Sequence, residues 1–525
     1  MKTNCIMFQG TGSHVGKSVL VAALCRIFLQ DGFKVAPFKS QNMALNSYVT
    51  KDGGEMGRAQ VVQAEAAGLA PSVLMNPVLL KPTGHATSQV IVMGRPVGNL
   101  SAQEYHEKYN MKVLGVVEEA LNKLRSEFEI VVIEGAGSPA EVNLQATEIV
   151  NMRIARMADC PVLLIADIDK GGALASVVGT LELLDPADRA RVAGVIINKF
   201  RGDIKLFQPA IDFLEKRTGI PVLGVVPYFQ GFRVQEEDSI PEDTLKSSRI
   251  TVENKIDIVV IRLPHISNFT DFDPFADEPD VHLRYVGQAN KIGNPDMIII
   301  PGSKNTIHDL VFLEKSGIAA KILEQENRGI PIVGICGGFQ IMGSELHDPL
   351  HTESDIDRIK GLGLLNMSTT FDPDKITTQV QAEVLGVGPL LKGAVGQSVK
   401  GYEIHMGRSV LADGVEPAFR IFERSTQKVE ILDGGVRSDG KVFGTYIHGI
   451  FDNDSFRRHI IDLIRIDKGW EPMVTDNLVT VFEQRDKDFN KLADVVRNSL
   501  NMDLLYKNIM KLNPEDKLTG QVEAE

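Results

Sequence analysis

Short apolar runs rich in β-branched residues alternate with longer segments of helical periodicity, and this alternation occurs twice along the chain. The first series predicts strands at residues 4–8, 35–38, 130–134, 161–166, 192–198 and 222–226. Between them lie helical patterns such as 17–31 and 112–126. Apolar strands that alternate with helices are typical of a parallel sheet covered on both faces. The sequence therefore predicts an α/β fold.

A polar, acidic stretch at 231–254 interrupts this alternation, and we interpret it as a linker. A second series then predicts strands at 256–262, 297–301, 332–335 and 442–448. Between residues 369 and 437, alternating Val, Thr and Gly predict antiparallel hairpins. We expect two doubly wound domains, at 1–230 and 255–455, followed by a helical C-terminal extension at 456–525.

Charge and cysteine content exclude several classes of protein. The 525 residues carry a formal net charge of −13, which disfavours nucleic acid and anionic membrane as partners. The 4 cysteines lie far apart without metal-ligand spacing, so neither a disulfide framework nor a zinc site is expected. No apolar run approaches the roughly 18 residues of a membrane span, and no signal peptide is apparent. We expect a cytoplasmic protein.

The run Gly10-Thr11-Gly12-Ser13-His14-Val15-Gly16-Lys17-Ser18 follows the first predicted strand and opens the first helix. Glycines let backbone N–H groups surround phosphates, and a helix N-terminus adds positive potential. Lys17 would reach the β- and γ-phosphates, and the Ser18 hydroxyl would ligate Mg²⁺. The strict pattern has Gly where this chain has Thr11. The run is still predicted to be an ATP-binding P-loop, which makes 1–230 the nucleotide-binding domain.

Carboxylates near this loop are candidate magnesium ligands. Glu134 ends an apolar strand, where a metal ligand is expected beside a phosphate loop. Glu55 is a second candidate, and Asp52 competes with it.

Three further strand ends carry polar residues. Asp167, Asp169 and Lys170 follow an apolar strand together with two glycines, and we expect them to form a substrate-side loop. Asn198 ends the next strand and is a candidate for reading the nucleotide base. Guanine recognition is unsupported because Arg201 stands where an N-K-x-D motif requires Asp. Adenine is therefore the expected base.

Cys336 lies between a predicted strand and a helix, in the run Pro331-Ile332-Val333-Gly334-Ile335-Cys336-Gly337-Gly338-Phe339-Gln340. Such a tight turn exposes a nucleophile and points backbone N–H groups, here including that of Gly337, at an oxyanion. The adjoining helix N-terminus is expected to lower the thiol pKa. Cys336 is therefore the predicted nucleophile.

A thiol nucleophile needs a base, and two histidines are candidates. His448 follows the last predicted strand, and His405 is its rival. We favour His448. No carboxylate follows it directly, because Gly449 and Ile450 come next, and Glu403 is a weak guess for the orienting group.

Both halves resemble known families. The G-x-C-x-G-x-Q spacing is similar to that of class I glutamine amidotransferases, which implies that His448 is the base and Gly302 a second oxyanion donor. The first loop resembles the dethiobiotin synthetase branch of P-loop proteins, which implies that Lys39 faces the phosphates. The P-loop of this chain lacks the lysine that partition ATPases have near the start of the loop. Glutamine would be the nitrogen donor, with ATP and Mg²⁺ required.

The combination of the two domains resembles the cobyric acid synthase family over roughly residues 1–460. The runs that carry this resemblance are 38–47, 57–60, 63–66, 76–82, 167–172 and 198–203. It implies ATP- and glutamine-dependent amidation of the b, d, e and g carboxylates of a corrinoid, adenosylcobyrinic acid a,c-diamide. Rival readings are a cobyrinic acid a,c-diamide synthase, another carboxylate amidotransferase such as a cell-wall precursor amidase, and a nucleotide-switched binding protein with an amidotransferase-like module.

Overall fold

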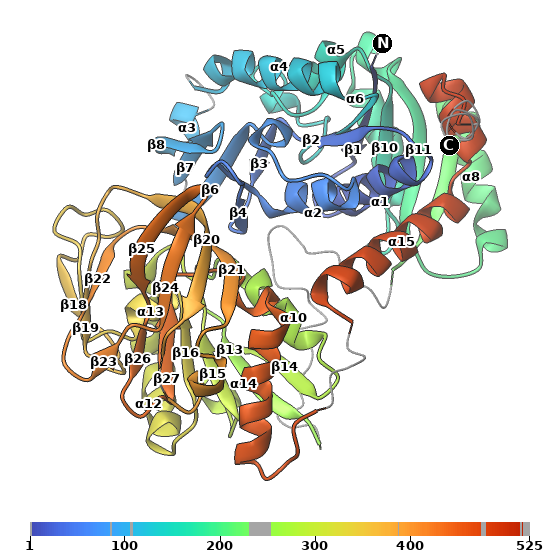
Figure 1. Ribbon diagram of the computed structural model, residues 1–525. Coiled ribbons are helices and arrows are strands. Elements are labelled where there is room, and N and C mark those ends of the chain that lie inside the picture. Colours follow the sequence, from blue (N-terminus) through green and yellow to red (C-terminus); the bar gives the residue numbers. More distant parts are fainter. Residues whose placement is uncertain are drawn as a thin grey trace. The chain divides into compact units, whose positions relative to one another are not determined.

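The computed structural model describes residues 3–84, 87–105, 109–229, 254–386, 388–473, 479–514 and 517 (Figure 1). The chain divides into two compact units that are not contiguous in sequence. Unit 1 comprises Met1–Ala44, Glu55–Gln235 and Phe482–Glu525, and unit 2 comprises Leu45–Gly54 and Glu236–Val481. The predicted linker at 231–254 lies outside the described residues except for Asn254.

A parallel sheet of six strands forms the centre of unit 1, in the order β12-β11-β10-β1-β9-β2. Its strands are β1 (Asn4–Gly10), β2 (Val35–Phe38), β9 (Ile130–Glu134), β10 (Val162–Asp167), β11 (Val192–Phe200) and β12 (Val222–Pro227). The sequence predicted all of them to within two residues, because strands buried on both faces are continuous apolar runs.

Helices cover both faces of this sheet: Figure 1 shows α1 and α2 on one side and α4 and α5 on the other. Before Phe482, the helices of unit 1 are α1 (Lys17–Gln30), α2 (Arg58–Ala66), α3 (Ala102–Glu104), α4 (Asn110–Glu127), α5 (Met152–Ala158), α6 (Ala173–Leu183), α7 (Pro186–Arg189) and α8 (Ile204–Thr218). A small sheet adds β3 (Gln41–Met43), β6 (Val78–Gly84), β7 (Thr87–Val92) and β8 (Arg95–Ser101), and β5 (Glu55–Gly57) precedes α2.

The end of the chain also belongs to unit 1. Helix α15 (Val481–Ser499) places Leu492, Ala493 and Val496 in the same apolar core as α1. Arg497 forms an ion pair with Asp31, at 2.8 Å, just beyond α1. The predicted helical C-terminal region is present in two parts, since α14 (Asp454–Asp467) packs in unit 2 and α15 packs in unit 1.

Unit 2 is built on a seven-stranded sheet of order β14-β13-β15-β16-β27-β26-β23. The parallel strands are β13 (Ile256–Ile261), β14 (Val281–Val286), β15 (Met297–Ile300), β16 (Ile332–Ile335) and β27 (Val442–Thr445). Strands β23 (Val415–Glu416) and β26 (Gly435–Arg437) extend it in antiparallel pairing. Helices α10 (Asp273–Ala276), α11 (Thr306–Lys315), α12 (Ile318–Asn327) and α13 (Gly337–Ile341) connect its strands. This arrangement confirms the second α/β series.

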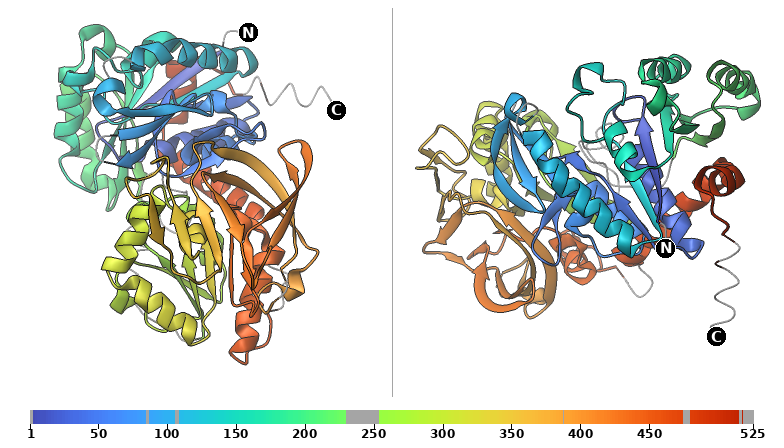
Figure 2. Two further views of the ribbon diagram at one scale, coloured as in Figure 1. Left: turned by 90° about the vertical axis from the view of Figure 1, so that its left-hand side faces the viewer. Right: turned by 90° about the horizontal axis from the view of Figure 1, so that it is seen from above.

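The predicted antiparallel hairpins are confirmed by a four-stranded sheet of order β21-β20-β24-β25. It contains β20 (Ile376–Val384), β21 (Ser398–His405), β24 (Phe419–Arg424) and β25 (Gln427–Asp433). Figure 2 shows these strands as a curved layer of their own. A second small sheet contains β17 (Glu345–His347), β18 (Arg358–Lys360), β19 (Met367–Thr370) and β22 (Arg408–Leu411).

Strand β4 (Ser47–Val49) lies in the segment Leu45–Gly54, which packs in unit 2. Within the described ranges, none of the helices combines the length and the apolar character that crossing a bilayer requires.

Candidate active site

The thiol site of unit 2 forms where neighbouring parallel strands end. Gly302 follows β15, Cys336 follows β16 and His448 follows β27. Asp271 lies in a single turn of 3₁₀ helix, Phe269–Phe272, after β13. Because β13, β15, β16 and β27 are adjacent and parallel, their carboxyl ends bring these groups to one edge of the sheet.

Cys336 occupies a sharp turn between β16 and α13. Its backbone has φ 52° and ψ −109°, a conformation that is rare for a residue with a side chain. The turn depends on the glycines around it. A Cβ atom on Gly338 would lie 1.9 Å from the carbonyl oxygen of Ile300, and one on Gly334 would lie 2.5 Å from the sulfur of Met342. The predicted nucleophile turn is therefore present.

His448 is the histidine that the fold brings to this thiol. Its ring is buried, with 1% of the side chain exposed, and its Nδ1 lies 2.6 Å from Oδ2 of Asp271. The other carboxylate oxygen of Asp271 accepts a hydrogen bond from the N–H of Gly449 at 3.1 Å. Cys336 lies close enough to His448 to raise the pKa of its imidazole. The three side chains therefore form the series carboxylate, imidazole and thiol.

The charge on His448 is set by this environment. Burial disfavours the imidazolium, but the Asp271 carboxylate and the Cys336 sulfur outweigh burial and raise the pKa of His448 to about 10. At neutral pH the ring therefore carries its second proton. Cys336 itself is 6% exposed, and its thiol points at the carbonyl oxygen of Ile404, 3.8 Å away.

The rival groups are engaged elsewhere. His405 stacks on the ring of Tyr446 with centroids 3.7 Å apart, and its Nε2 lies 3.5 Å from Glu403. Glu403 accepts two hydrogen bonds from Arg424, at 2.8 and 2.9 Å. The guess that Glu403 orients the catalytic imidazole is wrong, because Asp271 occupies that position on His448.

The sequence reasoning missed Asp271 because it follows the first strand of the second series, far upstream of Cys336. Asp271 could have been found from its place after a buried strand, because that strand ends at the sheet edge where Cys336 and His448 lie.

The predicted oxyanion donors lie beside the thiol and the imidazole. A Cβ atom on Gly302 would lie 3.1 Å from Cε1 of His448, and one on Gly337 would lie 2.8 Å from the backbone nitrogen of Ser303. The two turns therefore approach each other closely. Gln340 of the same motif is buried and donates to the carbonyl oxygen of Met406 at 2.8 Å, which ties α13 to the segment after β21.

In unit 1, the predicted P-loop connects β1 to α1. His14 and Gly16 adopt left-handed backbone conformations, with φ 59° and 95°. The Lys17 ammonium donates to the carbonyl oxygens of Gly12 and Gly137, at 3.1 and 3.2 Å, so it lies across the loop. This placement is typical of a lysine that binds phosphate.

Glu134 is the centre of a buried polar network next to this loop. It is 1% exposed and accepts hydrogen bonds from Ser18 at 2.7 Å and Lys39 at 3.0 Å. Gln63 and Gln60 of α2 donate to its other oxygen, at 2.5 and 3.3 Å. Burial disfavours its charge, but Lys39 and these donors together lower the pKa of Glu134. Gln60 and Gln63 were missed as site residues, although their three-residue spacing on a helix places them on one face.

The oxygen set of this network suits Mg²⁺. The Ser18 hydroxyl and the charged Glu134 carboxylate are hard ligands, which this ion prefers. Glu55 is fully buried and ion-paired with Lys81 at 2.7 Å. Asp52 accepts a hydrogen bond from Thr50 at 2.5 Å and belongs to unit 2. Among the described residues, no group of three or more Asp, Glu, His or Cys side chains is assembled to hold a metal. Mg²⁺ commonly binds through one or two carboxylates and substrate phosphates, so Ser18 and Glu134 fit such a site.

Asn198 contacts the P-loop from the end of β11. Its Nδ2 donates to the carbonyl oxygen of Val15 at 2.8 Å, and its buried Oδ1 has no partner in the structure as described. A Cβ atom on Gly16 would lie 2.2 Å from that Nδ2, so this contact requires glycine. Lys199, which the sequence reasoning did not select, donates to the carbonyl oxygen of His14 at 2.6 Å.

The predicted substrate-side loop lies next to Asn198. Asp167 is ion-paired with Lys199 at 3.0 Å, and Asp169 with Arg201 at 2.8 Å. Lys170 is exposed. The loop is therefore attached to the end of β11, the strand that also contacts the P-loop.

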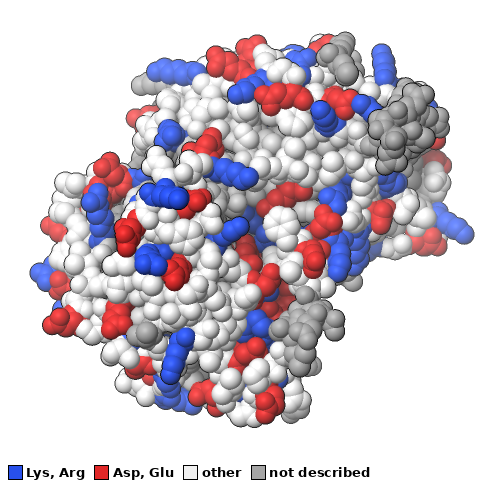
Figure 3. Space-filling model, viewed as in Figure 1, with Lys and Arg blue, Asp and Glu red and all other residues white. Residues whose placement is uncertain are grey.

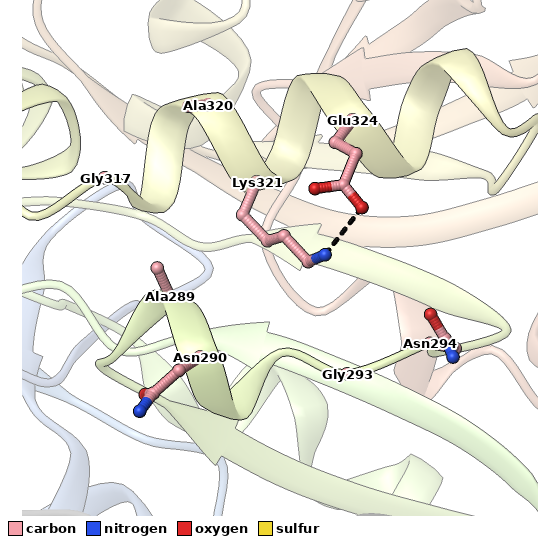
Figure 4. A pocket seen from close by; sticks show the side chains of 8 residues that line it. All are labelled: Ala289, Asn290, Gly293, Asn294, Gly317, Ala320, Lys321 and Glu324. Atoms are coloured by element: carbon pink, nitrogen blue, oxygen red, sulfur yellow. Dashed lines mark hydrogen bonds and ion pairs between the residues drawn. The ribbon is translucent and has the colours of Figure 1, made fainter.

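One hollow in the described part of unit 2 is lined by none of the predicted site residues. A hollow of about 420 Å³ lies between Ala289–Gly293 and helix α12, where Lys321 and Glu324 form an ion pair at 2.6 Å (Figure 4). On the face shown in Figure 3, basic and acidic side chains are interspersed, so no single-sign patch is seen there.

Comparisons with known proteins match both halves. A family model described as a CobQ/CobB/MinD/ParA nucleotide binding domain matches residues 6–241, and one described as a CobB/CobQ-like glutamine amidotransferase domain matches 257–456. The cobyric acid synthase of Moorella thermoacetica is 59% identical over 88% of this chain and 89% of its own length. Those of Pelotomaculum thermopropionicum and Streptococcus sanguinis are 54% and 51% identical, and cover 95% and 98% of this chain and 95% and 99% of their own lengths.

Proposed function

The chain belongs to the cobyric acid synthase family, and we propose that it amidates the b, d, e and g carboxylates of adenosylcobyrinic acid a,c-diamide to give adenosylcobyric acid. Each amidation consumes one glutamine and one ATP. One observation carries the proposal: a single chain contains both the Cys336–His448–Asp271 series and a P-loop whose Ser18 binds a buried Glu134.

Unit 2 supplies the nitrogen. The Cys336 thiolate adds to the side-chain carbonyl carbon of glutamine, and the electron pair of the carbonyl moves to oxygen, where the N–H groups of Gly302 and Gly337 stabilise it. His448 passes its proton to the departing nitrogen, so ammonia leaves and a glutamyl thioester remains. Water then attacks the thioester while His448 takes its proton. Glutamate leaves, and the free enzyme is restored.

Unit 1 activates the acceptor. A corrinoid carboxylate attacks the γ-phosphorus of ATP, ADP leaves, and an acyl phosphate forms. Lys17 and Lys39 offset the negative charge that develops on the transferring group. Mg²⁺ held by Ser18 and Glu134 would neutralise phosphate charge at this position. Neutral ammonia attacks the acyl carbon and displaces phosphate, and the product is the carboxamide.

The remaining assignments in unit 1 follow from its contacts. Asn198 lies against the loop and carries an unpartnered buried oxygen, which suits recognition of the adenine amino group. Asp167, Asp169 and Lys170 border the substrate. Glu55 is the proposed second carboxylate ligand of Mg²⁺.

The test is product analysis. With glutamine, ATP, Mg²⁺ and adenosylcobyrinic acid a,c-diamide, mass spectrometry should show successive products, each lighter by the difference between a hydroxyl and an amino group. Cobyrinic acid without its a and c amides serves as the comparison substrate. Preferential amidation of that compound at its a and c positions would instead identify an a,c-diamide synthase. No amide product from either compound would contradict the proposal.

A further inference from the structure

A short segment from the nucleotide-binding half of the sequence packs in unit 2. The chain leaves unit 1 after Ala44 and returns at Glu55, and Leu45–Gly54 between them belongs to unit 2. The segment is buried there: Asn46, Ser47, Val49 and Thr50 are each at most 1% exposed. A surface loop without a partner would not bury consecutive polar residues in this way.

The contacts of this segment involve Asn268 and Phe269, at the start of the turn that carries Asp271. The N–H of Ser47 donates to Oδ1 of Asn268 at 3.3 Å, and Oδ1 of Asn46 accepts from the N–H of Phe269 at 3.2 Å. The N–H of Asp271 donates to the carbonyl oxygen of Asn268 at 3.0 Å. Leu45–Gly54 therefore holds the turn that places the carboxylate on His448.

The segment also holds Tyr402, which covers the catalytic imidazole. The Tyr402 ring stacks on His448, with centroids 5.3 Å apart and planes 17° apart. Backbone hydrogen bonds of 3.1 and 2.8 Å join the same two residues in both directions. The Tyr402 hydroxyl accepts from Asn268 at 2.9 Å and donates to the carbonyl oxygen of Ser47 at 3.3 Å, and the Tyr48 ring packs 5.1 Å from the Tyr402 ring.

The residues on either side of the segment belong to the hydrogen-bond network around Glu134. Lys39, shortly before it, donates to Glu134. Asn42 donates to Gln60 at 2.8 Å, and Gln60 donates in turn to Glu134. After the segment, the N–H of Gly57 donates to Oδ1 of Asn76 at 3.0 Å, and Nδ2 of Asn76 donates to the carbonyl oxygen of Lys39 at 3.2 Å. A displacement of this network on ligand binding would act on both ends of Leu45–Gly54.

We propose that Leu45–Gly54 is a positioning element that couples the two reactions. Binding of ATP at Lys39 and Glu134, together with the corrinoid, shifts the segment. Its contacts with Asn268 and Tyr402 then align Asp271 and His448 for glutamine hydrolysis. The inference rests on the proposed function. Allosteric coupling typically changes the affinity of one site for its ligand by roughly 5- to 150-fold, and we expect stimulation of glutamine hydrolysis of that size.

The test measures glutamate release by the full chain with and without ATP plus adenosylcobyrinic acid a,c-diamide. The wild type should show stimulation in that range. Tyr48→Ala and Tyr402→Phe should reduce the stimulation ratio to near 1 while ammonium-dependent amidation continues. Tyr48→Phe retains the ring and should restore the ratio. Tyr506→Phe removes a hydroxyl bonded to Asp31 in unit 1 and is the matched control, with an unchanged ratio.

Two outcomes would overturn the coupling role. The first is a wild-type enzyme that makes amide but shows no stimulation. The second is a pair of variants that lose activity equally with and without acceptor, which indicates a structural role only. If the wild type makes no amide from glutamine or ammonium, the proposed function fails instead, so the two failures are distinguishable.

Discussion

Nδ1 of His448 lies 2.6 Å from Oδ2 of Asp271, although 177 positions separate the two residues in the sequence. The carboxylate fixes which ring nitrogen faces the thiol and stabilises the imidazolium. Asp271→Asn keeps the size of the side chain but removes its charge. Glutamine hydrolysis should fall by roughly 100- to 10,000-fold, the range typical of general acid–base catalysis. Ammonium-dependent amidation should continue. Exposed Asp467→Asn on α14 is the control, with unchanged hydrolysis.

The same Asp271→Asn substitution should change the pH profile. The Asp271 carboxylate is one of the groups that raise the pKa of His448 to about 10, so removing it lowers that pKa. The imidazolium then loses its proton at a lower pH, and the alkaline limit of kcat/KM for glutamine should move down. Measuring residual hydrolysis from pH 6 to 10.5 checks this. An alkaline limit that stays in place would mean that another group controls it.

Cys336→Ala separates the two reactions. The variant lacks the nucleophile, so glutamine-dependent amidation should disappear, while ammonium salts should still support amide formation from ATP and the corrinoid. Cys25→Ala, which alters a buried thiol in α1, provides a cysteine control that should retain both activities. Loss of ammonium-dependent activity in Cys336→Ala would contradict the division between units.

Lys39→Met tests the network around Glu134. The lysine lowers the pKa of this buried carboxylate, so its removal should raise that pKa. Amidation with either nitrogen source should fall, and its acid limit should move to higher pH. Hydrolysis of glutamine without ATP should persist. Lys321→Met breaks the exposed pair with Glu324 and should leave amidation unchanged, since such pairs contribute only about 0–1 kcal/mol to stability.

Gly338→Ala tests the packing of the nucleophile turn. The added methyl would lie 1.9 Å from the carbonyl oxygen of Ile300, so the turn must shift. The free energy of unfolding should fall by about 1–3 kcal/mol or more, as for other overpacked cores. Gly115→Ala on the exposed face of α4 has no atom within 4 Å and should instead raise it by about 0.5–1 kcal/mol. Thermal and denaturant unfolding measure both.

Asp433→Asn tests a buried carboxylate that contacts the chain just before His448. Asp433 accepts hydrogen bonds from Thr445 and the N–H of Tyr446, near the end of β27. Burial, with the nearby charge of Glu403, raises the pKa of Asp433 to about 7. A carboxyl pKa raised by folding stabilises the native state below about pH 4 and loses that contribution as pH rises through 7. In the variant, the free energy of unfolding should therefore fall less as pH rises, as measured between pH 4 and 8.

Much of the fold was predictable because buried parallel strands leave a clear pattern. Strands β1, β9 and β16 are continuous apolar runs, and the functional side chains follow them directly. The same logic predicted Cys336, His448, Lys17 and Glu134 as site residues.

Other features were not predictable from local pattern. Asp271 lies on a single turn of 3₁₀ helix, which has no periodicity to detect. Helix α15 resembles any amphipathic helix, and only tertiary packing places it against α1 rather than α14. The sequence of Leu45–Gly54 likewise indicates a loop of the first domain. Its place in unit 2 depends on Asn268 and Tyr402, which lie far away in the sequence.

The return of α15 to unit 1 has a consequence for biosynthesis. A ribosome releases the N-terminal end first, and domains generally fold as they emerge. Here Leu492, Ala493 and Val496 complete the core around α1, yet they are translated after the whole glutaminase unit. The nascent nucleotide-binding unit therefore carries an uncovered apolar surface until α15 is translated. A chain terminated before α15 would present that surface to chaperones and proteases.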